Sequence, residues 1–171
     1  EKGSTHFCVL IAYLKNTCLE KDSIVNCDET WCRVKRKGCY KKKYIWCLVN
    51  KLSKVVIYCY EDGSRGRDAL KHILGDSQVK ALQSDGYNVY LYLDDHMVDI
   101  EHLCCMAHAR AKFKYALDQG NDKDAAFILE LIGELYKLER EYEEGQLSPE
   151  QIKLCRNNLK TKEVIIKLRS K

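Results

Sequence analysis

The sequence lacks the features that mark membrane, secreted and repetitive proteins. It has no apolar run long enough to cross a bilayer, no secretory leader, no arginine-rich presequence, no internal repeat and no low-complexity linker. It also has no initiator methionine, so we expect an internal segment of a soluble, cytoplasmic protein without a membrane partner. At 171 residues the chain can form one domain, or one domain with a helical appendage.

The sequence is rich in cysteine. Ten cysteines would indicate a disulfide scaffold in a short secreted protein. Because no secretory leader is present and 46% of the residues are apolar, the chain can build an ordinary core without disulfides. We therefore expect reduced and mostly buried thiols.

Basic residues are concentrated in one short segment of a chain whose formal net charge is only +4. Seven of the eleven residues from 33 to 43 are basic: Arg33, Lys35, Arg36, Lys37, Lys41, Lys42 and Lys43. Such a run can neutralise the phosphates of a nucleic acid. The alternative is the solvated tip of a hairpin, and the residue pattern alone leaves both interpretations open.

Periodicity predicts a helix, a three-stranded meander, a short helix and two more strands. The expected ranges are 6–19 for the first helix, 23–28, 44–49 and 54–60 for the meander, 68–74 for the second helix, and 79–85 and 102–106 for the last strands, with a helix beginning at Ala107.

The last third of the sequence predicts helices only. Apolar residues at helical spacing span 122–144, and Gly145 ends the pattern. Ser148, Pro149 and Gln151 then have the spacing of a capped helix start, which predicts a second long helix running toward Lys171. We expect these two elements to form a helical hairpin.

Two acids each end a buried strand of this pattern. Asp28 ends the first strand, and Asp85 ends the fourth, directly before Gly86. If the sheet has the ribonuclease H-like arrangement, the first and fourth strands lie side by side, and both carboxylates reach the same metal ions. Carboxylate oxygens suit Mg²⁺ or Mn²⁺, and two such ions can drive phosphoryl transfer. Acids also end strands for solubility alone, which is the alternative.

A zinc site is a competing interpretation for one other cluster. Its residues are His102, Cys104, Cys105 and His108. The adjacent cysteines project to opposite faces of a strand, and a second ligand pair is missing, so we disfavour it. Similarly, Glu130, Glu134 and Glu139 fall on the polar face of an amphipathic helix, which carries acids for solvation alone.

Four motifs in order give the sequence a family resemblance. They are Cys27-Asp28-Glu29-Thr30, Gln83-Ser84-Asp85-Gly86-Tyr87, Cys105-Met106-Ala107-His108-Ala109-Arg110-Ala111-Lys112-Phe113 and Leu135-Tyr136-Lys137-Leu138-Glu139-Arg140-Glu141. Together they resemble successive signatures of the bacterial insertion-sequence sixty-six family of DDE transposases. The similarity covers about residues 20–145.

The resemblance implies a fold and a metal site. Asp28 and Asp85 would be the first two catalytic aspartates of a two-metal Mg²⁺ or Mn²⁺ site, while Glu29 would point to the other face of its strand. The third acid of the family, a glutamate, follows a helical insertion, and the chain is expected to end inside that insertion. The implied division is an N-terminal helix in 1–22, the first part of a ribonuclease H-like core in 23–117 and the insertion in 118–171.

The resemblance also implies DNA as a partner. The Cys105 to His108 segment is similar to a C-x-x-H element of several DDE transposase groups, whose histidine lies near the nucleic-acid backbone. Arg110 and Lys114 follow on one helix face and add candidate phosphate contacts. The alternative for His108 is a histidine satisfied in the core.

The expected activity is that of a bacterial cytoplasmic transposase. The complete protein would cut the 3′ phosphodiester at transposon ends, join the freed 3′ hydroxyl to target DNA and self-associate, whereas this segment alone would be inactive. The alternatives are a non-catalytic DNA-binding or assembly module, and a related ribonuclease H-like nuclease.

Overall fold

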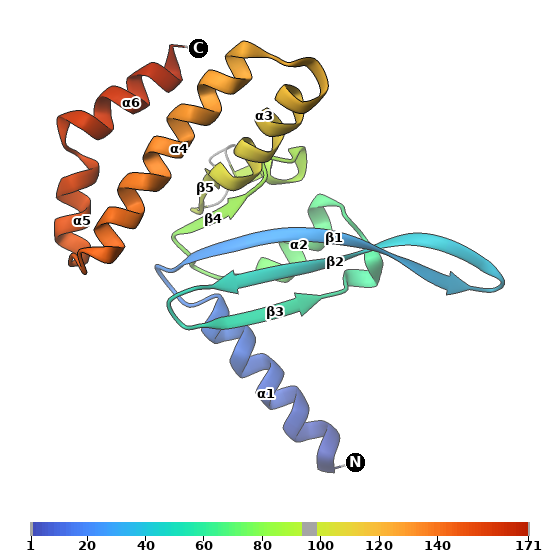
Figure 1. Ribbon diagram of the computed structural model, residues 1–171. Coiled ribbons are helices and arrows are strands. Elements are labelled where there is room, and N and C mark those ends of the chain that lie inside the picture. The colour runs from blue at the N-terminus through green and yellow to red at the C-terminus, as the bar shows by residue number, and fades with distance from the viewer. Residues whose placement is uncertain (1, 94–98, 171) are drawn as a thin grey trace. The chain divides into compact units, whose positions relative to one another are not determined.

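The computed structural model describes residues 2–93 and 99–170 (Figure 1). The chain forms two compact units that divide between Cys105 and Met106. The predicted division at 117/118 lies later in the chain, because the helix that begins at Met106 packs against the next helix. The assignment of 118–171 to an insertion remains a prediction.

The first unit is built on one mixed sheet. Its elements are α1 (Lys2–Cys18), β1 (Ile24–Arg36), β2 (Cys39–Asn50), β3 (Val55–Cys59), η1 (Glu61–Gly63), α2 (Arg67–Leu74), β4 (Ala81–Ser84), η2 (Asn88–Leu93) and β5 (Glu101–Cys104). The strand order is β3-β2-β1-β4-β5. Strands β1 to β3 are antiparallel, while β4 is parallel to β1 and β5 to β4. The predicted ribonuclease H-like sheet of five strands is confirmed.

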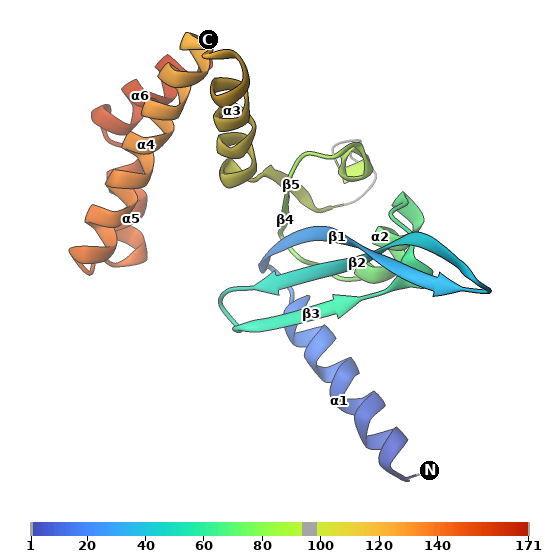
Figure 2. The same ribbon diagram turned by 45° about the vertical axis from the view of Figure 1, so that its right-hand side comes forward.

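The hairpin of β1 and β2 is much longer than the sequence predicted. The two strands pair from Val25 with Asn50 out to Arg36 with Cys39, and Lys37 and Gly38 form the turn with φ values of 48° and 81°. Two successive positive φ angles are typical of a tight hairpin turn that matches the twist of its strands. Because β3 pairs only with residues 46–50 of β2, the outer part of the hairpin is a two-stranded ribbon that extends beyond the sheet (Figures 1 and 2).

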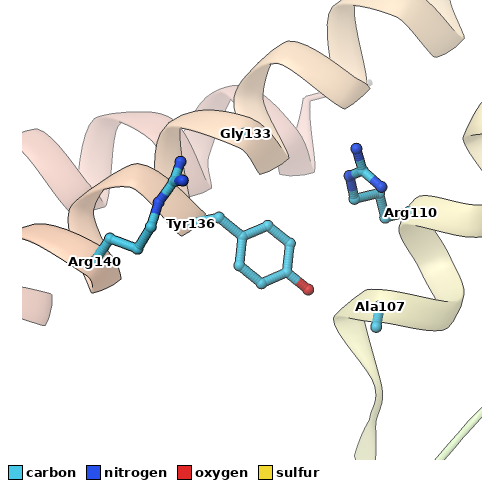
Figure 3. Close-up of a pocket in the computed structure, with 5 residues that line it drawn as sticks. All are labelled: Ala107, Arg110, Gly133, Tyr136 and Arg140. Carbon is cyan, nitrogen blue, oxygen red and sulfur yellow. The ribbon is translucent and has the colours of Figure 1, made fainter. Parts of the chain in front are cut away.

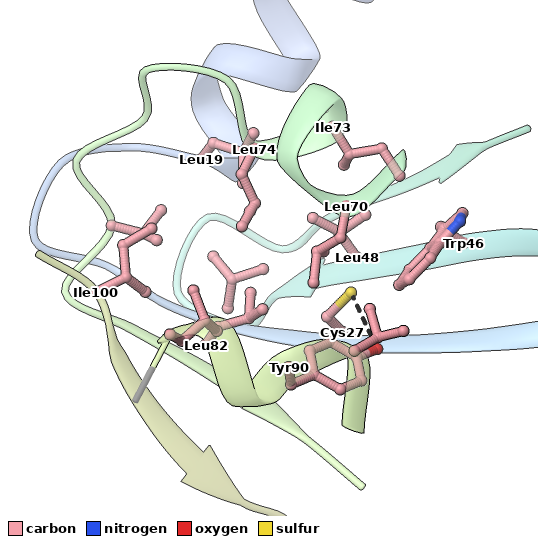
Figure 4. Packing of buried hydrophobic residues seen from close by; sticks show 14 of the residues in the cluster. Leu19, Cys27, Trp46, Leu48, Leu70, Ile73, Leu74, Leu82, Tyr90 and Ile100 are labelled. Atoms are coloured by element: carbon pink, nitrogen blue, oxygen red, sulfur yellow. Dashed lines mark hydrogen bonds between the residues drawn. The ribbon is translucent and has the colours of Figure 1, made fainter. Parts of the chain in front are cut away.

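The core of this unit lies on one face of the sheet. Trp46 and Leu48 of β2 pack with Leu70 and Ile73 of α2, and Tyr90 completes the cluster from η2 (Figure 4). All five side chains are fully buried. The Trp46 and Tyr90 rings meet edge to face with centroids 6.2 Å apart. Such aromatic pairs add to the stabilisation that burial itself provides.

Helix α1 contributes only its last residues to this core. Cys18 and the following Leu19 are buried, whereas the apolar residues Phe7, Leu10 and Ile11 are exposed. The outer turns of this helix therefore do not pack into the core of the first unit.

The cysteines are reduced but not mostly buried, contrary to the prediction. All ten lie in the described part of the chain and are free thiols. Only Cys18 and Cys27 are buried, and Cys8, Cys39 and Cys104 are exposed. The remaining five are partly covered, because most of them lie on strands whose outer face is open.

The second unit contains four helices: α3 (Met106–Gly120), α4 (Lys123–Glu144), α5 (Pro149–Arg156) and α6 (Leu159–Arg169). Asp122 caps α4, and Ser148 and Gln151 form the predicted capping box of α5. The single long helix expected after Ser148 is wrong, because the helix stops at Arg156 and Asn158 caps α6 by accepting a hydrogen bond from the Thr161 amide. No helix of the described residues is long and apolar enough to cross a membrane.

Candidate functional site

The two predicted catalytic aspartates lie in and directly after two neighbouring strands. Strands β1 and β4 pair in parallel with Val25 beside Leu82 and Asn26 beside Gln83. Asp28 lies two residues after Asn26 in β1, and Asp85 follows Ser84, the last residue of β4. Side chains alternate along a strand, so Asp28 shares a face with Asn26.

That face is fixed by a direct side-chain contact. Asn26 Nδ2 donates a hydrogen bond to Gln83 Oε1 at 2.5 Å. The two amides therefore join β1 and β4 on the face that carries Asp28, one step of the pleat before it. The core, with Val25, Cys27 and Leu82, lies on the opposite face.

Backbone amides orient both carboxylates. Asp28 Oδ1 accepts from the Glu29 amide at 2.8 Å, and Asp85 Oδ1 accepts from the Tyr87 amide at 2.9 Å. Asp28 is exposed and Asp85 is half-buried. Gly86 has φ of 76°, which L side chains rarely adopt, and this lets the chain turn directly after Asp85.

Glu29 points to the opposite face, as the alternation along the strand predicts. Its side chain is only 1% exposed and accepts hydrogen bonds from Arg65 Nε at 2.6 Å and the Tyr90 hydroxyl at 2.9 Å. Burial raises the pKa of Tyr90, so its hydroxyl remains a donor. Burial alone would lower the pKa of Arg65, but the hydrogen bond and charge of Glu29 raise it above the ordinary value.

Arg65 is the residue of this region that sequence reasoning missed. Its guanidinium carbon lies 3.8 Å from the centroid of the Tyr87 ring and 5.3 Å from that of Tyr44. The only local signal was a basic residue between Ser64 and Gly66 in a predicted turn. Its partners are distant in the sequence, so periodicity could not reveal them.

Asp28 and Asp85 fit a divalent cation chemically. Both supply the carboxylate oxygens that Mg²⁺ and Mn²⁺ prefer, one from β1 and one from the residue after β4. Among residues 2–93 and 99–170, no three or more His, Cys, Asp or Glu side chains are grouped to hold a metal ion. The aspartates therefore offer two protein ligand groups.

The zinc cluster considered from the sequence is not assembled in the described residues. His102 Nε2 instead lies 2.8 Å from the Ser84 hydroxyl, and its ring stacks on Tyr90 with centroids 5.8 Å apart. Cys104 is exposed on β5, while Cys105 precedes α3.

The predicted DNA-contact residues of the hairpin have different surroundings. Lys42 Nζ lies over the rings of Trp31 and Tyr44, at 5.1 Å and 5.4 Å from their centroids, and Lys35 Nζ lies 6.0 Å from that of Tyr40. Lys43 is half-buried and donates to the Asp62 carbonyl at 2.5 Å. Lys37 lies in the turn, and Lys41 is exposed on β2.

Helix α3 carries the other predicted DNA contacts. Arg110 lines an open pocket of about 480 Å³ with Ala107, Gly133, Tyr136 and Arg140. Figure 3 shows the Tyr136 ring projecting from α4 between the two arginines. Lys114 pairs with Asp118 one turn later, and His108 is half-buried.

The glutamates of α4 have a structural explanation. Arg156 of α5 donates from Nε and Nη2 to the two carboxylate oxygens of Glu139, at 2.7 Å and 2.6 Å. This bidentate pair joins the two helices. Glu130 and Glu134 are exposed on α4.

Comparison with known families decides the assignment of the chain. Residues 3–170 match the sequence profile of the Transposase IS66 family. The chain belongs to this family. The resemblance noted from the four motifs is thereby confirmed, and the IS66 match extends beyond the 20–145 range of those motifs.

Among curated proteins, no sequence matches this IS66-family chain. Solved structures that resemble it include a simian T-cell lymphotropic virus intasome in complex with PP2A regulatory subunit B56 gamma, at 14% identity and a TM-score of 0.37, covering 67% of this chain and 48% of the viral one. The chain thus spans about half the length of that relative.

Two structures of the HTLV-2 integrase catalytic core domain in complex with magnesium also resemble it. The trimeric form has 18% identity and a TM-score of 0.33, covering 61% of this chain and 80% of that one. The dimeric form has the same identity and TM-score, with coverages of 69% and 85%.

Proposed function

We propose that this IS66-family chain is the first part of a DDE transposase catalytic domain, with Asp28 and Asp85 as its first two metal-binding acids. The observation that carries the proposal is the parallel pairing of β1, which contains Asp28, with β4, which Asp85 directly follows. The predicted third acid would lie beyond Lys171, after a helical insertion that begins within this chain.

Each residue has a defined role in this proposal. Asp28 and Asp85 hold Mg²⁺ or Mn²⁺ through carboxylate oxygens, and their backbone hydrogen bonds fix the direction of those oxygens. When bound, the ions activate the attacking oxygen and stabilise the leaving oxygen of a phosphoryl transfer. Glu29, on the other face, anchors β1 through Arg65 and does not touch the reacting atoms.

The proposed reaction has two transfers at phosphorus. In the first, a water oxygen bonds to the phosphorus at the transposon end, the bond to the 3′ oxygen breaks, and that oxygen ends as a hydroxyl. In the second, this hydroxyl attacks a phosphodiester of target DNA and releases a target 3′ hydroxyl. The partners are therefore transposon-end and target DNA, with self-association of the complete protein.

The decisive assay measures cleavage and strand transfer on transposon-end DNA by the full-length protein. Asp28→Asn and Asp85→Asn should each abolish both products, because losing a carboxylate leaves an ion poorly placed for in-line attack. Asp76→Asn, an exposed acid in the loop after α2, serves as the matched control. Full activity of Asp85→Asn would refute the mechanism, whereas cleavage without joined products would identify a nuclease.

The segment of residues 1–171 alone should neither cut nor join DNA under these conditions. Activity of the segment that is lost in Glu139→Ala would show that the third acid lies on α4. The second candidate function is a DNA-binding or assembly module, which the density of basic residues on the hairpin favours. If the chain is such a module, the full-length protein should bind transposon ends without yielding cleavage or strand-transfer products.

A further inference from the structure

The outer part of the β1–β2 hairpin carries aromatic side chains that the fold does not use. Trp31 is 52% exposed and Tyr40 is 68% exposed, and neither belongs to the hydrophobic core. An exposed aromatic ring on a two-stranded ribbon gains little from burial. Packing of the core therefore does not explain the two exposed aromatic residues of this ribbon.

The strand register puts these rings on the same face as basic side chains. Trp31 pairs with Tyr44, and Lys35 pairs with Tyr40. Side chains of alternate residues share a face, so this face also carries Arg33 of β1 and Lys42 of β2. Three basic and three aromatic residues therefore share this face: Trp31, Arg33, Lys35, Tyr40, Lys42 and Tyr44.

The ribbon also carries a pocket. A pocket of about 380 Å³ is lined by Trp31, Arg33, Tyr40, Lys41 and Lys42. The sequence from Thr30 to Ile45 contains no acidic residue. The pocket thus combines two aromatic residues with Arg33 and Lys42 on the same face, and it has no carboxylate in its lining to repel a polyanion.

We propose that this ribbon binds unpaired nucleotides of DNA, with bases stacked on Trp31 and Tyr40 and the adjoining phosphates bound by Arg33 and Lys42. Aromatic rings bind bases of any sequence by stacking, while flanking cations bind the backbone, and this combination is characteristic of single-strand recognition. Duplex DNA presents its phosphates but keeps its bases stacked inside, so it uses only the cations. The inference rests on the proposed function for its DNA partner and adds the form of DNA that is recognised.

Lys42 has a specific part in this proposal. Without DNA its ammonium lies over the Trp31 and Tyr44 rings, which gives the cation a partner and holds the rings in place. A stacked base replaces the ammonium over Trp31, and the ammonium moves to the phosphate beside that base. The aromatic rings thus hold the lysine ready for its phosphate contact.

Binding is measured with this chain in EDTA, so that the outcome is independent of the metal site and of the proposed catalysis. The probes are single-stranded oligothymidylate, an abasic phosphodiester strand of the same length, and the matching duplex. Oligothymidylate should bind more tightly than the other two and should quench Trp31 fluorescence. Trp46 is fully buried and supplies a constant background.

Trp31→Ala should weaken oligothymidylate binding roughly tenfold, the loss expected for one stacked base, and leave abasic-strand binding unchanged. Trp31→Phe should restore most of the affinity, and Tyr40→Ala should give a smaller loss. Tyr58→Ala is the matched control, because Tyr58 is 72% exposed on β3, outside the ribbon.

The inference is overturned if the abasic strand or the duplex binds wild-type protein as tightly as oligothymidylate. It is also overturned if Trp31→Ala and Tyr40→Ala both retain wild-type affinity. Either result leaves the strand-transfer assay with Asp28 and Asp85 unaffected, so the failure of this inference is distinct from a failure of the proposed function.

Discussion

The guanidinium carbon of Arg65 lies 3.8 Å from the centroid of the Tyr87 ring. Arg65 also binds the buried carboxylate of Glu29, the residue after Asp28, while the backbone amide of Tyr87 binds Asp85. One side chain therefore connects the segments that carry the two aspartates.

Arg65→Met should lower the free energy of unfolding by about 2 to 3 kcal/mol, because it leaves the buried Glu29 carboxylate without its cation. The value is below that of a fully buried pair, since 34% of the Arg65 side chain is exposed. Urea unfolding measures the change, with Arg36→Ala as the exposed control. Adding Glu29→Gln to Arg65→Met should recover part of the loss. An unchanged midpoint in Arg65→Met would contradict the role assigned to the pair.

Metal binding to this chain should be weak, because two aspartates leave most of the coordination positions of Mg²⁺ or Mn²⁺ to water. Titration calorimetry with Mn²⁺ should show a low-affinity site that disappears in the Asp28→Ala, Asp85→Ala double variant. Asp76→Ala should bind as the wild type does. Tight binding that persists in the double variant would refute the assigned site.

Substitutions of the hairpin lysines should affect either DNA binding or stability. Lys41→Ala should weaken duplex DNA binding and reduce the salt slope, d log K/d log [salt], by about 0.9, the value for one lost phosphate contact. Lys43→Ala should instead lower stability by about 1 kcal/mol, because Lys43 donates a hydrogen bond to the Asp62 carbonyl. Filter binding across a salt series and urea unfolding measure the two effects. If replacing Lys41, Lys42 and Lys43 together changes neither affinity nor slope, the hairpin is only a solvated turn.

The protein should lose stability at alkaline pH through Cys27. Burial raises the pKa of its thiol from 9.0 to about 12, so the folded state keeps a proton that the unfolded state has released. This contribution is fully present below pH 9 and is lost as the pH rises toward 12, at about 1.4 kcal/mol per pH unit. Unfolding measured between pH 8 and 11 should show the decline, and Cys27→Ala should make it shallower. Part of the slope should remain, because burial also raises the pKa of Cys18 and Cys59.

The sheet could be predicted because the signals of its strands are local. Buried strands appear in the sequence as short β-branched runs, although Asp28, expected to end the first strand, lies inside β1. The order of strands then followed from the family resemblance. The capping box at Ser148 was equally local and was also correct.

The features that were missed depend on contacts between distant residues or on weak local preferences. Tyr90 belongs to a short 3₁₀ helix without periodicity, yet it is fully buried and binds Glu29. The strands of the ribbon were missed, and the sequence predicted only a hairpin tip at these residues. Lysine-rich strands that are exposed on both faces do not alternate between apolar and polar residues. The break between α5 and α6 comes from Asn157 and Asn158, whose preference for caps exceeded the helical pattern around them.

The parallel pairing of β1 with β4 has a consequence for the order of folding. The hairpin of β1 and β2 closes through a two-residue turn, and such hairpins form in microseconds. Asn26 and Gln83, whose side chains join β1 to β4, are 57 residues apart in the chain, so their contact carries a larger entropy cost of loop closure. We therefore expect the basic ribbon to form early and the aspartate pair to assemble late. During synthesis, the proposed DNA-binding ribbon would then form before the proposed metal site.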